Sequence, residues 1–381
     1  MSIYKGITVD GNAIEVNISD SKISKIKQIE NSEDLPLIGI PLVDAQNNGG
    51  IGYNYNHLSE NIDALPEMIK FYRSHGIGRI LATITTNLPE VIRKSGSALV
   101  NAMESDSDVD VFYPGFFHEG IYMSKLDGWR GGHQTKFIKD PDYHEFSETN
   151  KACHNKIKLV NIAPEEPGAM SFIEKAVADG VRVSLGHACP NAEQVAEAVK
   201  CGATMVTHFG NGANPTIHRH TNPFWSFLAH DELSLGIIGD SFHLPADLIK
   251  TAYKVKGKEK IVMVSDCAGL SGLRTGLHKD GKITIESNGY MHHTGEEILA
   301  ASWHQLDKGV EVLCNLGWSL ADAWRQCSEV PANQFNIKTD RIEEGASANF
   351  VLSKYSEASG LVLEKVLFKG EEIIPTPVNP Q

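Results

Sequence analysis

The 381-residue chain lacks the features that mark several classes of protein. No uninterrupted apolar run is long enough to span a bilayer, and the first residues enter a strand-like pattern without the apolar core of a signal peptide. The six cysteines are scattered and show no paired spacing, which argues against a disulfide framework and against a thiolate zinc site. We therefore expect a cytoplasmic protein with reduced thiols and no membrane partner.

The chain also has little positive charge. It carries 35 Lys and Arg against 48 Asp and Glu, a formal net charge of −13. Nucleic-acid phosphates are held by basic stripes, and none is visible, so no nucleic-acid partner is expected. A single arginine in a cleft can still bind a small anion. Low-complexity segments and internal repeats are absent as well, and the length allows one large barrel with a smaller module.

Strand-like and helix-like segments alternate regularly through the middle of the chain, the pattern of a parallel α/β fold. Helices are predicted at Asn61–His75, Gly168–Asp179, Asn191–Lys200 and Leu244–Lys256. The candidate strands are Leu42–Asn48, Arg79–Thr85, Val109–Glu119, Ile157–Glu165, Val181–His187, Met205–Asn211, Leu235–His243 and Ile261–Asp266. Eight parallel strands are the number that closes a (β/α)8 barrel of the TIM type.

Both ends of the chain are rich in short β segments. The N-terminal part turns at Asp10-Gly11-Asn12, and the part after Asn349 turns at Lys369-Gly370. We expect the ends to pair into one small discontinuous β domain. The predicted divisions are 1–41 and 336–381 for this domain and 42–335 for the barrel.

Two histidines end successive predicted strands. His187 and His208 lie on either side of the 191–200 helix, and Glu119 ends an earlier strand. The carboxyl ends of barrel strands share one face, so the three side chains can meet there. One carboxylate and two imidazoles with room for water suit a catalytic zinc ion. The alternative is that each histidine only caps a strand and hydrogen-bonds a loop.

Other polar residues at the strand ends have chemistry to offer. Asp266 is placed to take a proton from a water at the metal and return it to a leaving group, or else to cap a helix. His243 is placed to donate a hydrogen bond to a developing oxyanion, or else is a structural histidine. The glycine-rich segment after His208 offers the amides of Asn211 and Gly212 and the Arg219 guanidinium to a phosphate, or else is a plain solvated loop.

Several segments together resemble the amidohydrolase superfamily and, within it, the N-acetylglucosamine-6-phosphate deacetylases. The resemblance covers nearly the whole chain and is strongest at Phe117–Gly120, Val183–His187, Gly202–His208, Asp240–His243 and Val264–Asp266. It implies a distorted (β/α)8 barrel with a small β-sandwich built from the two termini. It also implies a homodimer with active sites near the interface.

The resemblance implies roles for particular residues. Glu119, His187 and His208 would bind one divalent metal ion per subunit, zinc or iron(II), and Asp266 would be the general acid and base, with His243 as a second catalytic group. Binding of the phosphorylated amino sugar would fall to Gln46, Gly132, His133, Asn211, Gly212, Arg219, Leu299, Ala300 and Ala301.

The chain departs from the superfamily at its first barrel strand. Many members carry a His-x-His pair there, whereas this chain has Gln46 and Asn48, and amides are poorer zinc ligands than imidazoles. A mononuclear centre is therefore expected.

The predicted activity is hydrolysis of the acetamide of N-acetylglucosamine 6-phosphate, or of a close N-acetylhexosamine phosphate, to acetate and the amine. The alternatives are hydrolysis of another amide, such as an N-acyl amino acid or a cyclic amide, and a silent sugar-phosphate-binding protein. Changes near Arg219, and a longer loop carrying Trp129 and Arg130, fall in what would be the sugar pocket.

Overall fold

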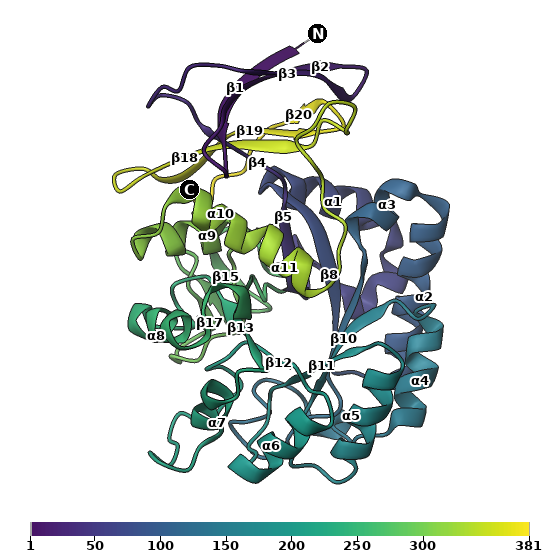
Figure 1. Cartoon of the computed structure of the whole chain (residues 1–381). Helices are drawn as coiled ribbons and strands as arrows, with labels where there is room; N and C mark the ends of the chain where they lie inside the picture. The colour runs from purple at the N-terminus through teal and green to yellow at the C-terminus, as the bar shows by residue number, and fades with distance from the viewer. Residues whose placement is uncertain (1, 381) are drawn as a thin grey trace.

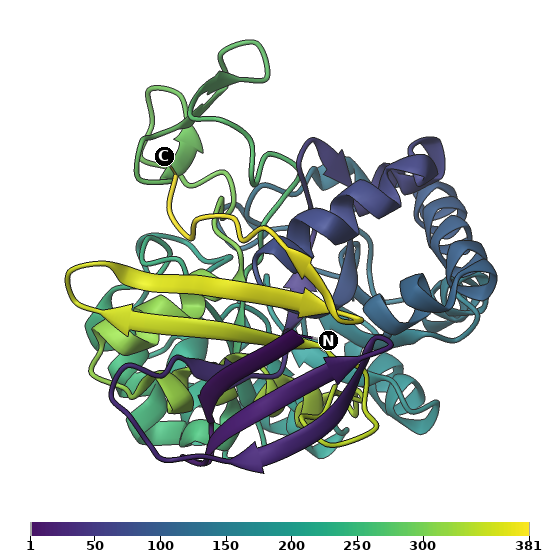
Figure 2. The same cartoon turned by 90° about the horizontal axis from the view of Figure 1, so that it is seen from above.

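The computed structural model describes residues 2–380, and in it the two ends of the chain come together. In Figure 1 the purple N-terminal strands and the yellow C-terminal strands lie side by side above the rest of the molecule, and Figure 2 shows them from above. Below them lies a larger α/β barrel. Segments more than 300 positions apart thus form one β unit, since Val351 pairs with Gly39 and Leu352 with Ile38.

The barrel contains, within residues 2–380, eight parallel strands in the order β5-β8-β9-β10-β11-β12-β13-β14. Their bounds are β5 Leu42–Asn47, β8 Ile77–Thr85, β9 Gly115–Glu119, β10 Ile157–Ile162, β11 Arg182–Leu185, β12 Met205–Val206, β13 Ser234–Ile238 and β14 Ile261–Val264. Backbone hydrogen bonds join the first and last strands, because Asp266 N–H donates to the Gln46 carbonyl and Asn48 N–H to the Cys267 carbonyl, each at 2.9 Å. The predicted (β/α)8 barrel is confirmed.

The inside of the barrel is filled by apolar side chains, one inward-facing set from alternating strand positions. Three residues that follow α11, or lie in it, close one end: Ala332, Phe335 and Ile337. The strand residues in this cluster are Val43, Ala45, Leu81, Phe117, Leu159, Met205, Ile238, Val262 and Val264. The barrel is therefore a packed core, and chemistry is confined to its rim.

Helices surround the strands, as Figure 1 shows. Their bounds are α1 Leu65–Ser74, α2 Pro89–Ser105, α3 Ser107–Phe112, α4 Tyr143–Ala152, α5 Ala169–Ala178, α6 Ala192–Lys200, α7 Pro223–Ala229, α8 Ala246–Lys256, α9 Leu306–Asn315, α10 Leu320–Cys327 and α11 Glu329–Gln334. Helix α6 begins with a capping box, in which Asn191 accepts from Gln194 N–H and Gln194 accepts from Asn191 N–H. This cap starts the helix four residues after His187.

One predicted strand was wrong in its first half. Residues 109–112 of the expected strand Val109–Glu119 belong to helix α3, and only Gly115–Glu119 is β9. The Asp106 side chain accepts from Asp108 N–H at 2.8 Å and caps the helix, so a local polar contact overrides the apolar run. Other predicted strands ran too far: β12 ends at Val206, β13 at Ile238 and β10 at Ile162.

The terminal sheet has, over residues 2–380, seven strands in the order β20-β19-β18-β4-β1-β2-β3. Gly11, with φ +84°, and Lys369-Gly370, with φ +51° and +75°, make the turns that the sequence predicted. The bounds are β1 Ser2–Thr8, β2 Ala13–Ser19, β3 Lys22–Gln28, β4 Leu37–Gly39, β18 Phe350–Ser356, β19 Gly360–Phe368 and β20 Glu371–Ile373. The two-part β domain is thus present, whereas its predicted limits at residues 41 and 336 stay a prediction.

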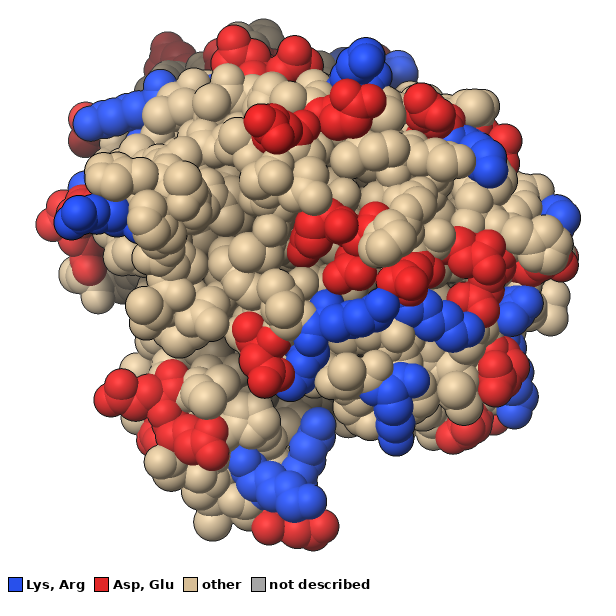
Figure 3. All heavy atoms as spheres, turned by 90° about the horizontal axis from the view of Figure 1, so that it is seen from below, with Lys and Arg blue, Asp and Glu red and all other residues tan. Residues whose placement is uncertain are grey.

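Smaller elements complete the molecule. Strands β15 Gly276–His278, β16 Ile283–Ile285 and β17 Met291–His293 form a separate antiparallel sheet, and β6 Gly49–Gly50 pairs with β7 Tyr53–Asn54. Among the described helices, none has the length and apolar character needed to cross a bilayer. On the face away from the terminal sheet, basic and acidic side chains lie interspersed (Figure 3).

Candidate metal centre

Three polar side chains converge at the carboxyl ends of β9, β11 and β12. His208 Nε2 lies 2.9 Å from Glu119 Oε1 and 2.9 Å from His187 Nε2, and His187 Nε2 lies 3.3 Å from Glu119 Oε1. All three side chains are at most 7% exposed. The structure therefore brings together the three residues that the sequence nominated as metal ligands.

This spacing fits a single metal ion. Tetrahedral ligands at about 2.0–2.2 Å from zinc are separated from one another by roughly 3.3–3.6 Å, so the three donor atoms need to move apart by only a few tenths of an ångström. His187 Nδ1 lies 3.2 Å from the Trp129 carbonyl, an acceptor, so Nδ1 carries the proton and Nε2 presents its lone pair to the other two ligands. One carboxylate and two imidazoles, with the tautomer of the His187 ring fixed by the Trp129 carbonyl, can thus hold a divalent cation.

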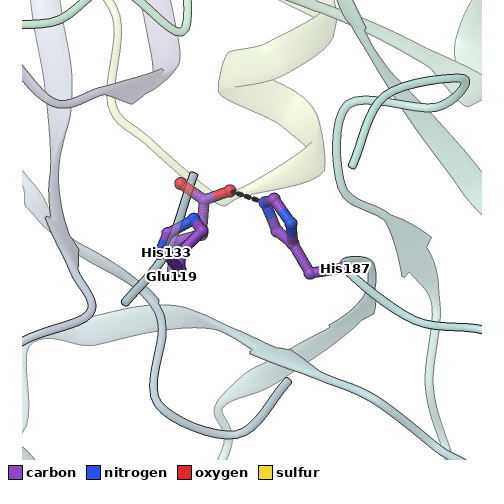
Figure 4. Close-up of side chains that lie close together, drawn as sticks. All are labelled: Glu119, His133 and His187. Carbon is purple, nitrogen blue, oxygen red and sulfur yellow. Dashed lines mark ion pairs between the residues drawn. The ribbon is translucent and has the colours of Figure 1, made fainter. Parts of the chain in front are cut away.

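The electrostatics of the cluster favour an ionised Glu119. Burial alone would raise the pKa of this carboxyl, but hydrogen bonds from His187 and His208 outweigh burial and hold the pKa well below its usual range. Figure 4 shows the Glu119 carboxylate directed at the His187 ring, with His133 beside Glu119. A second combination, Glu119, His133 and His187, also has its donor atoms within 4.8 Å of one another. The set with His208 is more compact, and we regard it as the centre.

Asp266 follows β14 and is held by two amides from the end of β5. Asn48 Nδ2 donates to Asp266 Oδ1 at 2.7 Å, and Gln46 Nε2 donates to the same oxygen at 3.1 Å. Burial and the nearby Glu119 charge raise the pKa of Asp266 to about 7. The second oxygen, Oδ2, is in neither of these bonds, so the carboxyl is oriented while one oxygen stays available for proton transfer.

A buried network under Asp266 fixes the seam between β5 and β14. Asp44 is fully buried, and its carboxylate accepts from Ser265 Oγ at 2.5 Å and from Ser265 N–H at 3.2 Å. Asp44 also accepts from Gln46 N–H at 3.3 Å and from Asn47 Nδ2 at 3.2 Å. One carboxylate therefore ties down the neighbours of both Gln46 and Asp266. Burial raises the pKa of Asp44 to about 6.

The backbone is strained at three of the candidate residues. His187, His208 and Asp266 have φ values of +49°, +27° and +48°, in the left-handed region that β-carbon-bearing residues rarely adopt. Each of them lies two residues after the end of a barrel strand. Such conformations cost roughly 1–3 kcal/mol each and concentrate at functional sites.

Two glycine-containing loops pack against the His187 ring. A β-carbon on Gly212, which has φ +57°, would lie 2.7 Å from His187 Nδ1, so only glycine fits there. Asn211, beside it, has a buried side-chain nitrogen without a partner among the described residues. From the other loop, His133 lies edge-on to His187 at 4.6 Å between ring centres, and its Nδ1 lies 2.8 Å from Thr86 Oγ1. Gly132 is exposed beside it.

The segment Leu299–Ala301 reaches the same region through Ser302, the residue that follows it. Ser302 forms a parallel bridge with Cys267, the residue after Asp266. Ala300 and Ala301 pack on the small cluster formed by Ile283, Ile285, Met291 and Trp303. His243 lies in the loop after β13, where its Nδ1 is 2.6 Å from Asp240 Oδ2.

Arg219 is the predicted site residue that the structure does not bring to the cluster. It lies on an exposed loop, where its carbonyl accepts from Trp225 Nε1 at 2.9 Å. Over residues 2–380, no ion pair or hydrogen bond joins its guanidinium to the residues around His187.

Sequence reasoning missed several contributors. Asn48 was taken only as a replaced ligand, yet its amide holds Asp266; Asp44 was given no role; and the Trp129 carbonyl and the Thr86 hydroxyl were not singled out. The one signal for Asp44 in the sequence was its position as an acidic residue within a predicted barrel strand, Leu42–Asn48. Contacts made by a backbone carbonyl leave no trace in residue type.

Comparison with known proteins gives a consistent picture. A Bacillus subtilis N-acetylglucosamine-6-phosphate deacetylase is 26% identical over 360 residues, 92% of this chain and 88% of that protein. The Thermotoga maritima N-acetylglucosamine-6-phosphate deacetylase structure superposes with TM-score 0.80 at 25% identity, covering 98% and 100% of the two chains. No family model matches the sequence.

Two more distant structures share the fold. A mutant of the Mycobacterium smegmatis N-acetyl-D-glucosamine-6-phosphate deacetylase, in complex with N-acetyl-D-glucosamine-6-phosphate, gives TM-score 0.81 at 21% identity over 98% and 100% of the chains. An enamidase described as a member of the amidohydrolase superfamily gives TM-score 0.55 at 14% identity over 100% and 97%. The chain therefore has the fold of the amidohydrolase superfamily and is a homologue of the N-acetylglucosamine-6-phosphate deacetylases.

Proposed function

We propose that this protein is a metal-dependent deacetylase that hydrolyses the acetamide of N-acetylglucosamine 6-phosphate to acetate and the amino-sugar phosphate. The observation that carries the proposal is the convergence of Glu119, His187 and His208 within 2.9–3.3 Å, next to a half-buried Asp266. The names of the relatives support this substrate, and the M. smegmatis complex supports a phosphorylated amino sugar as the ligand.

Glu119, His187 and His208 would hold the metal ion. When bound, a divalent ion polarises an amide carbonyl and lowers the pKa of water toward about 7. We infer one ion per subunit, because Gln46 and Asn48, at the positions of the usual second histidine pair, are engaged with Asp266. Zinc is the proposed ion and iron(II) the alternative, since both accept this donor set.

Asp266 is the proposed general base and then general acid. With Oδ1 held by Asn48 and Gln46, Oδ2 takes a proton from the attacking water and gives it to the departing nitrogen, so that the C–N bond breaks as acetate and amine form. Without metal the pKa of Asp266 is about 7, and a bound cation lowers it, so the carboxyl is ionised and able to accept a proton at neutral pH. His243 is the proposed donor to the carbonyl oxygen as negative charge develops there.

Sugar binding is assigned to the two loops beside the His187 ring. Gly132 and His133 come from one loop, Asn211 and Gly212 from the other, and the amide of Gln46 with Leu299–Ala301 completes the set. Arg219 stays a candidate for the phosphate from the sequence alone. A cytoplasmic location and a homodimer likewise stay predictions from the sequence.

The test is acetate release by zinc-loaded protein from N-acetylglucosamine 6-phosphate, with the galactosamine epimer and the unphosphorylated sugar in parallel. Release confined to phosphorylated sugars is expected. A Glu119→Gln protein, in which an amide replaces the ligand carboxylate at constant shape, is the matched control and should be inactive. Stoichiometric zinc without release from any of these sugars would overturn the proposed substrate class.

A further inference from the structure

Glu165 reaches from the loop after β10 to the loop that carries His187. Strand β10 ends at Ile162, and three residues later the Glu165 Oε1 atom accepts from Cys189 N–H at 2.5 Å. Cys189 is the second residue after His187. The other carboxylate oxygen of Glu165, Oε2, is buried and has no hydrogen-bond partner among residues 2–380. The carboxylate thus makes one short bond, to the backbone just beyond a candidate metal ligand.

The backbone at His187 depends on support from outside its own strand. His187 has φ +49°, and a strained conformation persists only where its surroundings hold it. Gly186 N–H, directly before it, donates to the last carbonyl of β10 at a long 3.4 Å. The other two strained residues have shorter backbone bonds, since Asp266 N–H donates at 2.9 Å and Phe209 N–H, directly after His208, donates at 2.7 Å. Contacts from neighbouring loops therefore matter most at His187.

Three such contacts hold His187 from different segments. Ser124, in the loop after β9, donates its N–H to the His187 carbonyl at 2.8 Å. The Trp129 carbonyl lies 3.2 Å from the ring Nδ1, and Glu165 holds the N–H of Cys189. Ser124 and Trp129 act through their backbones, whereas Glu165 acts through its side chain. The Glu165 contact is therefore the one that a substitution can remove.

Stability of the fold does not account for this carboxylate. Burial raises the pKa of Glu165, although the Cys189 N–H and the fully buried Ser124 side chain act against this. A buried carboxyl with an unpaired oxygen costs free energy that an apolar side chain of the same size would not. The adjacent Glu166 is different, because its side chain pairs with Lys125 at 3.8 Å.

We propose that Glu165 is a positioning residue for the metal centre, which holds the Cys189 amide and so fixes the backbone that presents His187 Nε2 to the ion. Without this bond the loop after β11 relaxes from its strained conformation, and the ring no longer stays beside Glu119 and His208. The inference rests on the metal centre of the proposed function. It does not depend on which amide the protein hydrolyses.

The test measures the zinc dissociation constant of the folded protein by competition with a chromophoric chelator. Glu165→Met removes the acceptor at similar volume and should raise the dissociation constant about 10- to 100-fold. Glu165→Gln keeps an oxygen for the Cys189 N–H and should stay within roughly 5-fold of wild type. Glu165→Asp keeps the charge but is one methylene too short, and should weaken binding about 10-fold, even if Glu165→Met does not fold.

Glu166→Met is the matched control, because it removes the neighbouring carboxylate, which does not contact the His187 loop, and it should leave zinc affinity unchanged. Urea unfolding of the metal-free variants measures any purely structural effect separately. Wild-type zinc affinity in folded Glu165→Met or Glu165→Asp would overturn the proposal, and so would a Glu165→Gln protein that binds zinc as weakly as Glu165→Met.

The zinc titration needs no substrate, so its outcome can be separated from that of the proposed function. If wild type binds zinc but releases no acetate, the proposed substrate fails, and the order of zinc affinities among the variants still decides the role of Glu165. If wild type binds no zinc, the metal centre fails and the positioning role is overturned with it.

Discussion

The two ends of the barrel use buried charge differently. At the carboxyl ends of the strands, the buried Glu119 interacts electrostatically with the half-buried Asp266, and His187, His208 and Asp266 are held at positive φ. At the seam with the terminal sheet, acids and bases are paired: Arg79 with Asp340 at 3.1 Å, and Arg73 with Asp108 at 3.0 Å, around a cavity of about 770 Å³. Strained backbone and neighbouring acids mark the end that carries the candidate metal centre, whereas oppositely charged pairs mark the end that holds the two parts together.

Loss of a metal ligand should cause the largest loss of activity at the carboxyl ends of the strands. Glu119→Gln should lose bound metal and lower kcat/KM by roughly 10³-fold or more, because a metal ion supplies several kcal/mol of transition-state stabilisation. Metal content by atomic emission and acetate release measure the two effects. Glu104→Gln, at a 58% exposed carboxyl, is the matched control and should change neither. Full metal content in Glu119→Gln would contradict the assigned centre.

Removal of the proton-transfer group should be the next largest effect. Asp266→Asn should keep metal and fold but lower kcat by about 10²- to 10⁴-fold. Because a base acts when ionised, wild-type kcat/KM should rise with pH through the pKa of Asp266, about 7 without metal and lower when a cation is bound. This limb should vanish from the variant's residual pH profile. An unchanged turnover number would refute the role.

At the seam, a charge deletion should affect stability and leave activity alone. Arg79→Met removes the partner of Asp340, whose side chain is 11% exposed, and leaves that carboxylate buried and unpaired. The free energy of unfolding in urea should fall by about 3–5 kcal/mol, with kcat per folded molecule unchanged. Arg341→Met, at a pair whose side chains are 69% and 58% exposed, should lose far less. A large drop in kcat for Arg79→Met would mean that the two ends are coupled.

Asp44 should make the free energy of unfolding depend on pH. Its pKa rises from 3.8 to about 6 in the folded protein, so folding favours the protonated form and stability is lost as pH rises from about 4 to 6. Relative to Asp44→Asn, metal-free wild type should lose about 3 kcal/mol across that window, the equivalent of about two pKa units. Urea unfolding at several pH values measures this difference. A pH-independent difference would contradict the raised pKa.

Sequence reasoning reached the architecture because periodicity is a local property. Alternating apolar segments were enough to predict the barrel, and the turns at Gly11 and Lys369-Gly370 were predicted from residue type. It was wrong at residues 109–112, which were predicted to be extended but belong to helix α3, whose cap is Asp106. Strand ends were also placed too late, because polar residues after β12 and β13 belong to strained loops and not to the ladder.

The candidate site divides in the same way. His187, His208 and Glu119 could be nominated because strand ends of a parallel barrel share one face. The hold that Gln46 and Asn48 have on Asp266 could not be predicted, since it joins residues 218 and 220 positions apart across the closing seam. Arg219 was predicted as a phosphate ligand because of its guanidinium group, but in the folded chain it lies on an exposed loop.

The sequence by itself determined which elements form, where the metal-ligating residue types fall along them, and that the termini supply a β unit. Only the tertiary structure decided which oxygen of Asp266 is held, which nitrogen of His187 bears the proton, and that three site residues have positive φ. The physical reason is that periodicity and residue type act over a few neighbours. Proton positions and strain depend instead on contacts that closure of the barrel creates between distant segments.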